Sequence, residues 1–188
     1  MNRSREYAMV LVMSGMMAMS ALAGEASTSA SAGNRGGGNA AATANYVGDG
    51  LAGLARTRTR TGAVNAATGL AVGVDSDGLD FSFSHAIAGQ RGPAYAGTFN
   101  LSIGNNGHVS GSYGGVVAQG GAVRDVAAGG ATRSSPGGTS TAFARGNTFP
   151  GGTVQATTHT YNRPAQRVVR PVAYRPIVIR QPARLGRR

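Results

Sequence analysis

Large apolar residues and small polar residues alternate along the middle of this chain with a period of two. Leu70, Val72 and Val74 occupy alternate positions, and a second alternating run begins at Leu79. This period places every second side chain on the same face of a sheet, which is typical of β-strands. Residues 69–115 are therefore predicted to form antiparallel strands and to be the best-defined part of the fold.

The apolar pattern fixes the register of the first predicted hairpin. Asp75 to Gly78 forms the turn, because Asp and Gly favour tight turns. Pairing Val74 with Leu79 then sets large residues opposite one another as far as Leu70 and Phe83. All of these side chains fall on one face, which we expect to be the core.

The second predicted hairpin offers two registers. A two-residue loop would pair Ile103 with Ser110 and set apolar residues against polar ones. A three-residue loop from Asn105 to Gly107 pairs Ile103 with Val109 instead. It also puts glycine where such loops require a positive φ angle. The apolar pattern favours the three-residue loop, and two hairpins in succession predict a meander.

The same kind of analysis divides the whole chain. Residues 24–45 are rich in Gly, Ala, Ser and Thr and are predicted to be a disordered low-complexity linker. Residues 46–161 are predicted to form a Gly-rich, mainly β domain, either a small antiparallel meander of sandwich-like form or an irregular β-solenoid. Residues 162–188 carry Arg-Pro steps, which disfavour helix, and are predicted to be a disordered basic tail.

Residues 1–23 have the three parts of a secretory signal. Arg3 and Arg5 precede an apolar stretch, and Ala21 to Ala23 fits the small-x-small cleavage pattern. Cleavage after Ala23 would make Gly24 the first residue, with no transmembrane segment in the mature chain. We therefore expect export to the periplasm, the cell surface or the medium. The alternative is a retained anchor, although the apolar stretch is short for a membrane-spanning helix.

Composition narrows the function. The chain has no Cys, and its formal net charge of +11 comes entirely from arginine, since it contains no Lys. The alternation from Arg56 to Thr61 predicts an edge strand whose charges discourage edge pairing, with an anion-binding ladder as the alternative. Self-association of the chain is left open.

Little in the sequence suggests catalysis. His85, His108 and His159 have no metal-ligand spacing, and no nucleophile motif is present. We assign no catalytic or cofactor-binding residue and no cofactor, and we expect a non-enzymatic protein. Asp75, Asp77 and Asp80 form the one carboxylate cluster. We interpret it as a polar turn, with a calcium site as the alternative.

The C-terminal segment carries the functional hypothesis. It contains eight arginines and no acidic residue, and guanidinium groups pair well with phosphate and carboxylate. We therefore expect it to bind anionic polymers of the cell envelope or matrix rather than to read nucleic-acid sequence. In composition it resembles proline- and arginine-rich antimicrobial peptides, which implies a membrane-active alternative. The predicted binding residues are Arg163, Arg167, Arg170, Arg175, Arg180, Arg184, Arg187 and Arg188.

These observations favour an exported structural or surface protein. The alternatives are a small secreted enzyme or calcium-binding module, and a membrane-active protein that acts through its basic tail. A basic tail that only keeps the protein soluble is the simplest alternative to a binding role for that segment.

Overall fold

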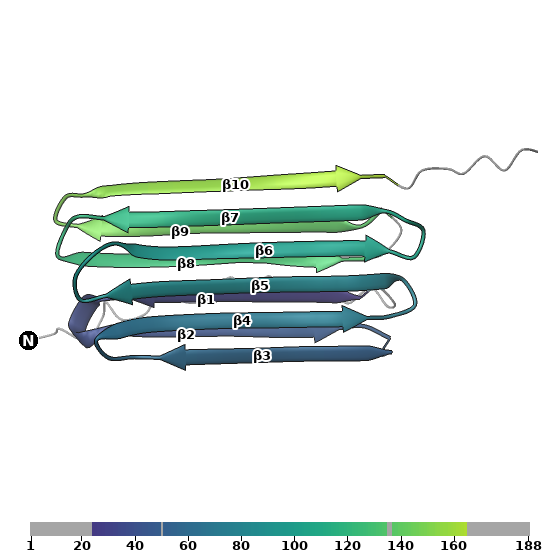
Figure 1. The fold of residues 1–188 in the computed structure, drawn as a ribbon, viewed down its shortest axis with the longest axis horizontal. Helices are drawn as coiled ribbons and strands as arrows, with labels where there is room; N and C mark the ends of the chain where they lie inside the picture. The colour runs from purple at the N-terminus through teal and green to yellow at the C-terminus, as the bar shows by residue number, and fades with distance from the viewer. Residues whose placement is uncertain (1–23, 50, 135–136, 165–188) are drawn as a thin grey trace, which may run out of the picture.

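Two antiparallel sheets lie face to face in this protein (Figure 1). The computed structural model describes residues 24–49, 51–134 and 137–164. The four-stranded sheet has the order β2-β1-β8-β9, and the six-stranded sheet has the order β10-β7-β6-β5-β4-β3. The mainly β, sandwich-like prediction is therefore confirmed over the solenoid alternative. The strands are β1 (Glu25–Gly33), β2 (Asn39–Val47), β3 (Ala52–Arg60), β4 (Val64–Val74), β5 (Gly78–Gly89), β6 (Ala94–Gly104), β7 (Val109–Gln119), β8 (Val123–Arg133), β9 (Thr139–Phe149) and β10 (Thr153–Arg163).

Helical structure is nearly absent from the described residues. The one helical element there is a 3-10 turn at Arg35–Gly37, between β1 and β2. No helix in this part of the chain has the length and apolar character needed to cross a membrane.

Both predicted hairpins have the predicted register. Val74 pairs with Leu79 across β4 and β5, and Ile103 pairs with Val109 across β6 and β7. The Gly104 N–H donates to the His108 carbonyl at 2.8 Å, which closes the three-residue loop. Gly107 has a φ of 81°, as the loop requires. The hairpins join into the predicted meander from β4 to β7.

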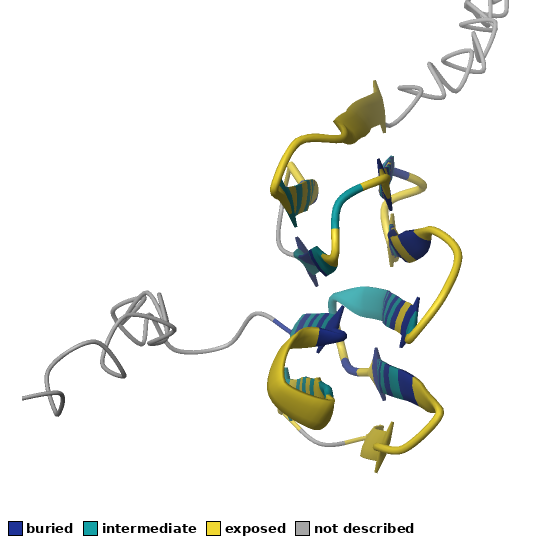
Figure 2. Cartoon of the chain, turned by 90° about the vertical axis from the view of Figure 1, so that its left-hand side faces the viewer, coloured by how far each residue is buried: buried dark blue, intermediate teal, exposed yellow. Residues whose placement is uncertain are grey.

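The space between the sheets is filled by small side chains. Alanines from both sheets form the apolar cluster, and no residue larger than Val belongs to its buried members. The sheets approach so closely that a Cβ atom on Gly69 of β4 would lie 2.5 Å from the Thr43 carbonyl oxygen of β2. Figure 2 shows the two layers, with buried residues gathered in the inner strands and exposed residues in the edge strands and turns.

A chain of polar hydrogen bonds crosses this interior. Thr28 Oγ1 of β1 lies 2.8 Å from Ser82 Oγ of β5, and that hydroxyl donates to Asn100 Oδ1 at 2.6 Å. Asn100 Nδ2 donates to the Thr141 carbonyl of β9 at 3.0 Å. Buried polar groups in a low-dielectric interior stabilise the fold only when they are paired. This chain of bonds pairs the side chains of Thr28, Ser82 and Asn100 and ties the two sheets together.

The large apolar residues lie on the opposite side from the one we predicted. Ser82, Ser84 and Ala86 point inward from β5, whereas Phe81 and Phe83 are only partly buried. The predicted shared face is therefore real, but it is the outer face of the six-stranded sheet. The reason is the close approach of the sheets, which leaves no room for a phenyl ring between them.

The predicted linker at 24–45 is also wrong. Residues Glu25–Gly33 form β1, which lies between β2 and β8 in the four-stranded sheet. Its alternation of Ala or Thr with Ser is a strand pattern built from small residues, and Ala26, Ala30 and Ala32 are buried. Small residues suffice here because the facing sheet is equally small.

We predict that enlarging an inner residue harms stability more than truncating an outer one. Ala86→Leu should lower the free energy of unfolding by about 1–3 kcal/mol, because the interior cannot expand. Phe83→Ala should cost less than the roughly 3–5 kcal/mol typical of a core phenylalanine. Urea unfolding of both variants measures the difference. A larger loss for Phe83→Ala than for Ala86→Leu would place the core on the other face.

Candidate functional site

The outer face of the six-stranded sheet carries most of the large apolar side chains of the described residues. We call it the apolar face. Single exposed apolar residues are ordinary, whereas a contiguous apolar surface is a candidate binding site. Tyr113 is 53% exposed and Phe99 is 46% exposed, near the centre of the surface. The face comprises Leu54, Leu70, Val72, Val74, Leu79, Phe81, Phe83, Ile87, Tyr95, Phe99, Leu101, Ile103, Val109, Tyr113 and Val117.

Strand register arranges these side chains in rows across the sheet. One row runs through six strands and ends in a cation at one side and a histidine at the other. Its aromatic members touch their neighbours: the Tyr113 and His159 rings stack with centroids 4.9 Å apart, and Phe99 lies 6.1 Å from Phe81 of the next row. The row is Arg56, Leu70, Phe83, Phe99, Tyr113 and His159.

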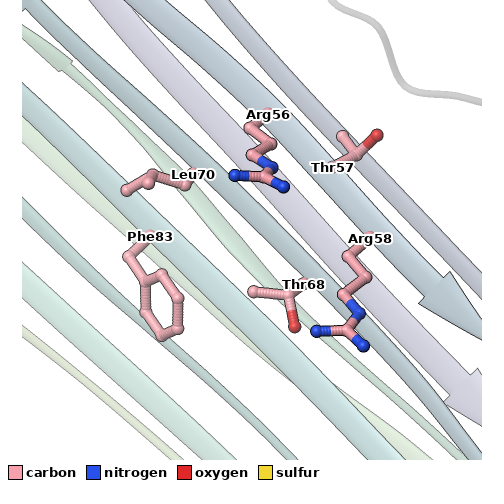
Figure 3. Close-up of a pocket in the computed structure, with 6 residues that line it drawn as sticks. All are labelled: Arg56, Thr57, Arg58, Thr68, Leu70 and Phe83. Atoms are coloured by element: carbon pink, nitrogen blue, oxygen red, sulfur yellow. The ribbon is translucent and has the colours of Figure 1, made fainter.

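A shallow hollow of about 260 Å³ lies where the apolar face meets β3. Figure 3 shows the guanidinium groups of Arg56 and Arg58 extending from β3 on the same side as Leu70 and Phe83. Thr57 and Thr68 complete its lining. Two guanidinium groups next to an apolar floor suit a ligand that combines a phosphate, sulfonate or carboxylate with a hydrocarbon part.

His85 belongs to this same face rather than to a core. Its ring stacks on Phe83 with centroids 5.6 Å apart, and Nε2 forms a hydrogen bond with the Tyr95 hydroxyl. Partial burial lowers the pKa of the His85 imidazole. The neutral ring therefore dominates at neutral pH and adds to the aromatic surface.

Two of the three predicted calcium candidates converge inside the sandwich. Asp75 Oδ1 accepts hydrogen bonds from the backbone N–H groups of Asp77 and Gly78, both at 2.9 Å, which is the geometry of a polar turn. Asp75 and Asp80 are buried, whereas Asp77 stays on the partly exposed turn. No three His, Cys, Asp or Glu side chains in the described part of the chain group in a way that could hold a metal.

We call the buried end that contains these two carboxylates the acidic pocket, formed by Gly24, Tyr46, Asp75 and Asp80. Burial raises the pKa of the Asp80 carboxyl. Nearby hydroxyl groups lower it in part, and the Asp75 carboxylate raises it again. The pKa of the Tyr46 hydroxyl is also raised. Burial is the largest cause, and the negative charges of Asp75, Asp49 and Asp80 raise the pKa further. The hydroxyls beside Asp80 belong to Ser134, Ser102 and Thr132.

The predicted polyanion-binding residues are placed only in part. Arg163 is the last residue of β10, where it is exposed and opposite Val109. The other seven lie outside the described residues: Arg167, Arg170, Arg175, Arg180, Arg184, Arg187 and Arg188.

The sequence pattern correctly predicted that β3 is an edge strand, but it did not predict that the apolar face lies beside it. The order of the sheet ends at β3, as the Arg-Thr alternation predicted. The pairing of Arg56 with Leu70 and of Leu70 with Phe83 then puts the arginines next to the apolar face. The Arg-Thr alternation showed that the arginines share one face of the strand. To place them beside the apolar residues, one also had to know that the large residues point outward.

Comparison with known proteins identifies no similar protein. No family model matches the chain, and neither a curated protein nor a solved structure matches it.

We predict that the native protein binds the anionic dye 8-anilinonaphthalene-1-sulfonate at the hollow. Changing both Arg56 and Arg58 to Gln should weaken binding about three- to tenfold, because each exposed guanidinium–anion contact contributes about 0.2–1 kcal/mol. Fluorescence titration measures the affinity. The matched control is Arg91→Gln with Arg145→Gln, which removes the same charge from exposed positions elsewhere. Equal weakening in both double variants would mean that the effect is net charge alone.

Proposed function

We propose that this protein is an exported, non-enzymatic surface or matrix protein that attaches to the anionic lipid-bearing layer of the cell envelope. The observation that carries the proposal is the apolar face with two guanidinium groups at its border. Such a surface matches a layer that presents phosphate groups over acyl chains. The eight arginines of residues 163–188 add a second, sequence-derived attraction to the same anionic partner.

The export part of the proposal rests on the first residues. The secretory pattern of residues 1–23 ends directly before the folded part, since β1 begins at Glu25. The lack of Cys gives no disulfide, and the fold relies on sheet pairing and close packing instead.

The matrix part of the proposal is supported by uncharged sheet edges. β2 is an edge strand of the four-stranded sheet and contains no charged residue between Asn39 and Val47. β10 is an edge of the other sheet, and its one arginine, Arg163, is at its end. Unprotected edges pair readily with other strands, whereas the arginines of β3 oppose such pairing. Self-association through β2 or β10 fits a protein that covers a surface.

We predict that the exported product begins at Gly24. Signal cleavage follows small residues at positions −3 and −1, here Ala21 and Ala23. Intact-mass measurement of the product from the expressing cells checks the N-terminus. A product that retains Met1 and remains in the membrane fraction would contradict export.

We predict that the full mature chain binds vesicles that contain phosphatidylglycerol and ignores vesicles of phosphatidylcholine. Changing Phe83 and Phe99 to Ser should abolish binding at all salt concentrations, because the apolar contribution is not screened. Changing the eight arginines of the C-terminal segment to Gln should weaken binding mainly at low salt. At physiological ionic strength the Debye length is only about 8 Å, so the attraction between these charges and the vesicle is already largely screened. Flotation assays measure the bound fraction.

The control for the aromatic variant is Phe143→Ser with Phe149→Ser, on β9 of the other sheet. Both residues are exposed, so the same loss of aromatic area occurs away from the apolar face. If this control loses binding as fully as the Phe83 and Phe99 variant, the apolar face is not the attachment surface. If all variants bind like the unmodified protein, lipid attachment is wrong.

A further inference from the structure

The acidic pocket contains two buried carboxyl groups. Asp80 is fully buried and Asp75 is 6% exposed. Three of their carboxylate oxygens, Asp75 Oδ2 and both oxygens of Asp80, accept no hydrogen bond of full geometry from the described residues. The hydroxyls nearest to them belong to Ser102, Thr132 and Ser134 beside Asp80 and to Tyr46 beside Asp75, and all of these groups are uncharged. Buried carboxylates without partners destabilise a fold strongly. A cation with several N–H donors would stabilise the ionised form of both carboxyl groups.

Gly24 lies against these same oxygens. A Cβ atom placed on Gly24 would lie 1.6 Å from Asp75 Oδ2 and 3.0 Å from Asp80 Oδ2. Its Cα therefore sits beside both carboxylates, and its nitrogen is about 1.46 Å from that Cα. The Ser134 N–H donates to the Gly24 carbonyl at 3.3 Å and holds the residue there. Glycine is the residue that fits this position without a clash.

We propose that the α-ammonium group of Gly24, released by cleavage after Ala23, is the cation that occupies the acidic pocket, so that removal of the signal completes the fold. This inference rests on the proposed export. Cleavage adds one water across the Ala23–Gly24 peptide bond, leaving a carboxylate on Ala23 and an amine on Gly24. The amine takes up a proton at neutral pH, because an α-amino group ordinarily has a pKa of about 7.7–8.0.

The donor count favours an ammonium group over a metal ion. An ammonium group has three N–H donors, and the pocket offers three unpartnered carboxylate oxygens. The fourth oxygen, Asp75 Oδ1, already accepts two turn hydrogen bonds. Calcium requires six to eight oxygen ligands. Asp77, the third carboxylate of the sequence motif, stays outside the buried pair.

The unprocessed chain lacks this cation. Its Gly24 nitrogen is an amide with one N–H and no charge, so the two carboxylates remain unbalanced. The titratable groups that act on the pocket are Asp80 on β5, Asp75 in the β4–β5 turn, and Tyr46 and Asp49 from the β2 side. Glu25 of β1 and Arg133 of β8 pair with each other one position along, where the strand alternation directs side chains to the other face of the sheet. The precursor should therefore be less stable than the mature protein near neutral pH.

The absence of lysine makes the test direct. In a recombinant chain that begins at Gly24, the α-amine is the only primary amine. Acylation by acetic anhydride, followed by mass spectrometry, measures its accessibility. We expect the native amine to react at least tenfold more slowly than the amine in urea. Asp75→Asn with Asp80→Asn should remove that protection in the residual folded fraction, whereas the control Asp125→Asn, on β8 at the other end, should keep it.

Stability provides a second measurement that does not depend on a folded double variant. A chain that retains residues 21–23 should have a folded-to-unfolded ratio at least tenfold lower at pH 7 than the chain beginning at Gly24. The paired carboxylates raise the ammonium pKa in the folded state. The advantage of the mature chain is therefore fully present just below pH about 8, while the carboxylates are ionised, and is lost as pH rises through the folded-state pKa of the amine. It is also lost at acid pH as the carboxylates take up protons, and the raised pKa of Asp80 brings that loss to a higher pH.

Each outcome decides the matter. A native amine that reacts as fast as the unfolded one overturns the pairing. Stabilisation by millimolar calcium, abolished by Asp75→Asn and accompanied by an unprotected amine, overturns it in favour of a metal ion. If the recombinant amine is protected but the product from cells begins at another residue, the pocket can bind the amine, but the predicted cleavage after Ala23 is wrong. That last result separates failure of the export assignment from failure of the pocket.

Discussion

The whole structure depends on how closely the two sheets approach each other. Alanine, serine and glycine fill the interior, and a single added Cβ atom on Gly69 would collide with the facing strand. Close contact compensates for small side chains, because many atoms then lie at van der Waals distance. It also brings Ser82 and Asn100 within hydrogen-bonding reach of the opposite sheet. Burial of large apolar residues, the usual source of stability, has little part in this interior.

That constraint determines where the aromatic residues lie. Phenyl rings cannot enter the gap, so they gather on the outer face, where rows of side chains from adjacent strands cover one another. Their contacts are lateral, as between Tyr113 and His159, and leave one side of each ring exposed. The apolar face is thus a direct result of the narrow interior. Its position beside the β3 arginines gives it the character of a surface for amphiphilic anions.

The sequence allowed the local structure to be predicted but not which side of the sheet faces inward. Turn chemistry and residue size set the pairing of Ile103 with Val109, and both are local properties. The direction of the face depends on the partner sheet, whose strands β1 and β8 are about a hundred residues apart. Large apolar residues normally mark the inside, and here that general rule was wrong. The same bias made residues 24–45 resemble a linker, since their small side chains suggested no core.

The candidate sites divide in a similar way. The turn geometry of Asp75 follows from neighbouring residues and was predictable. The meeting of Asp80 with Tyr46 and Gly24 depends on tertiary packing. The arginines of β3 were visible as an alternation, but their neighbours Leu70 and Phe83 became relevant only once the outer face was known.

The central position of β1 affects when the chain can fold. β1 begins at Glu25, yet its inner neighbour β8 ends at Arg133. The four-stranded sheet therefore cannot form until more than two thirds of the polypeptide has been made. Contacts of such long sequence separation form slowly, because the chain must close a long loop first. Until β8 has been made, β1 lacks its inner partner, so the N-terminal part of this fold is among the last parts to be completed.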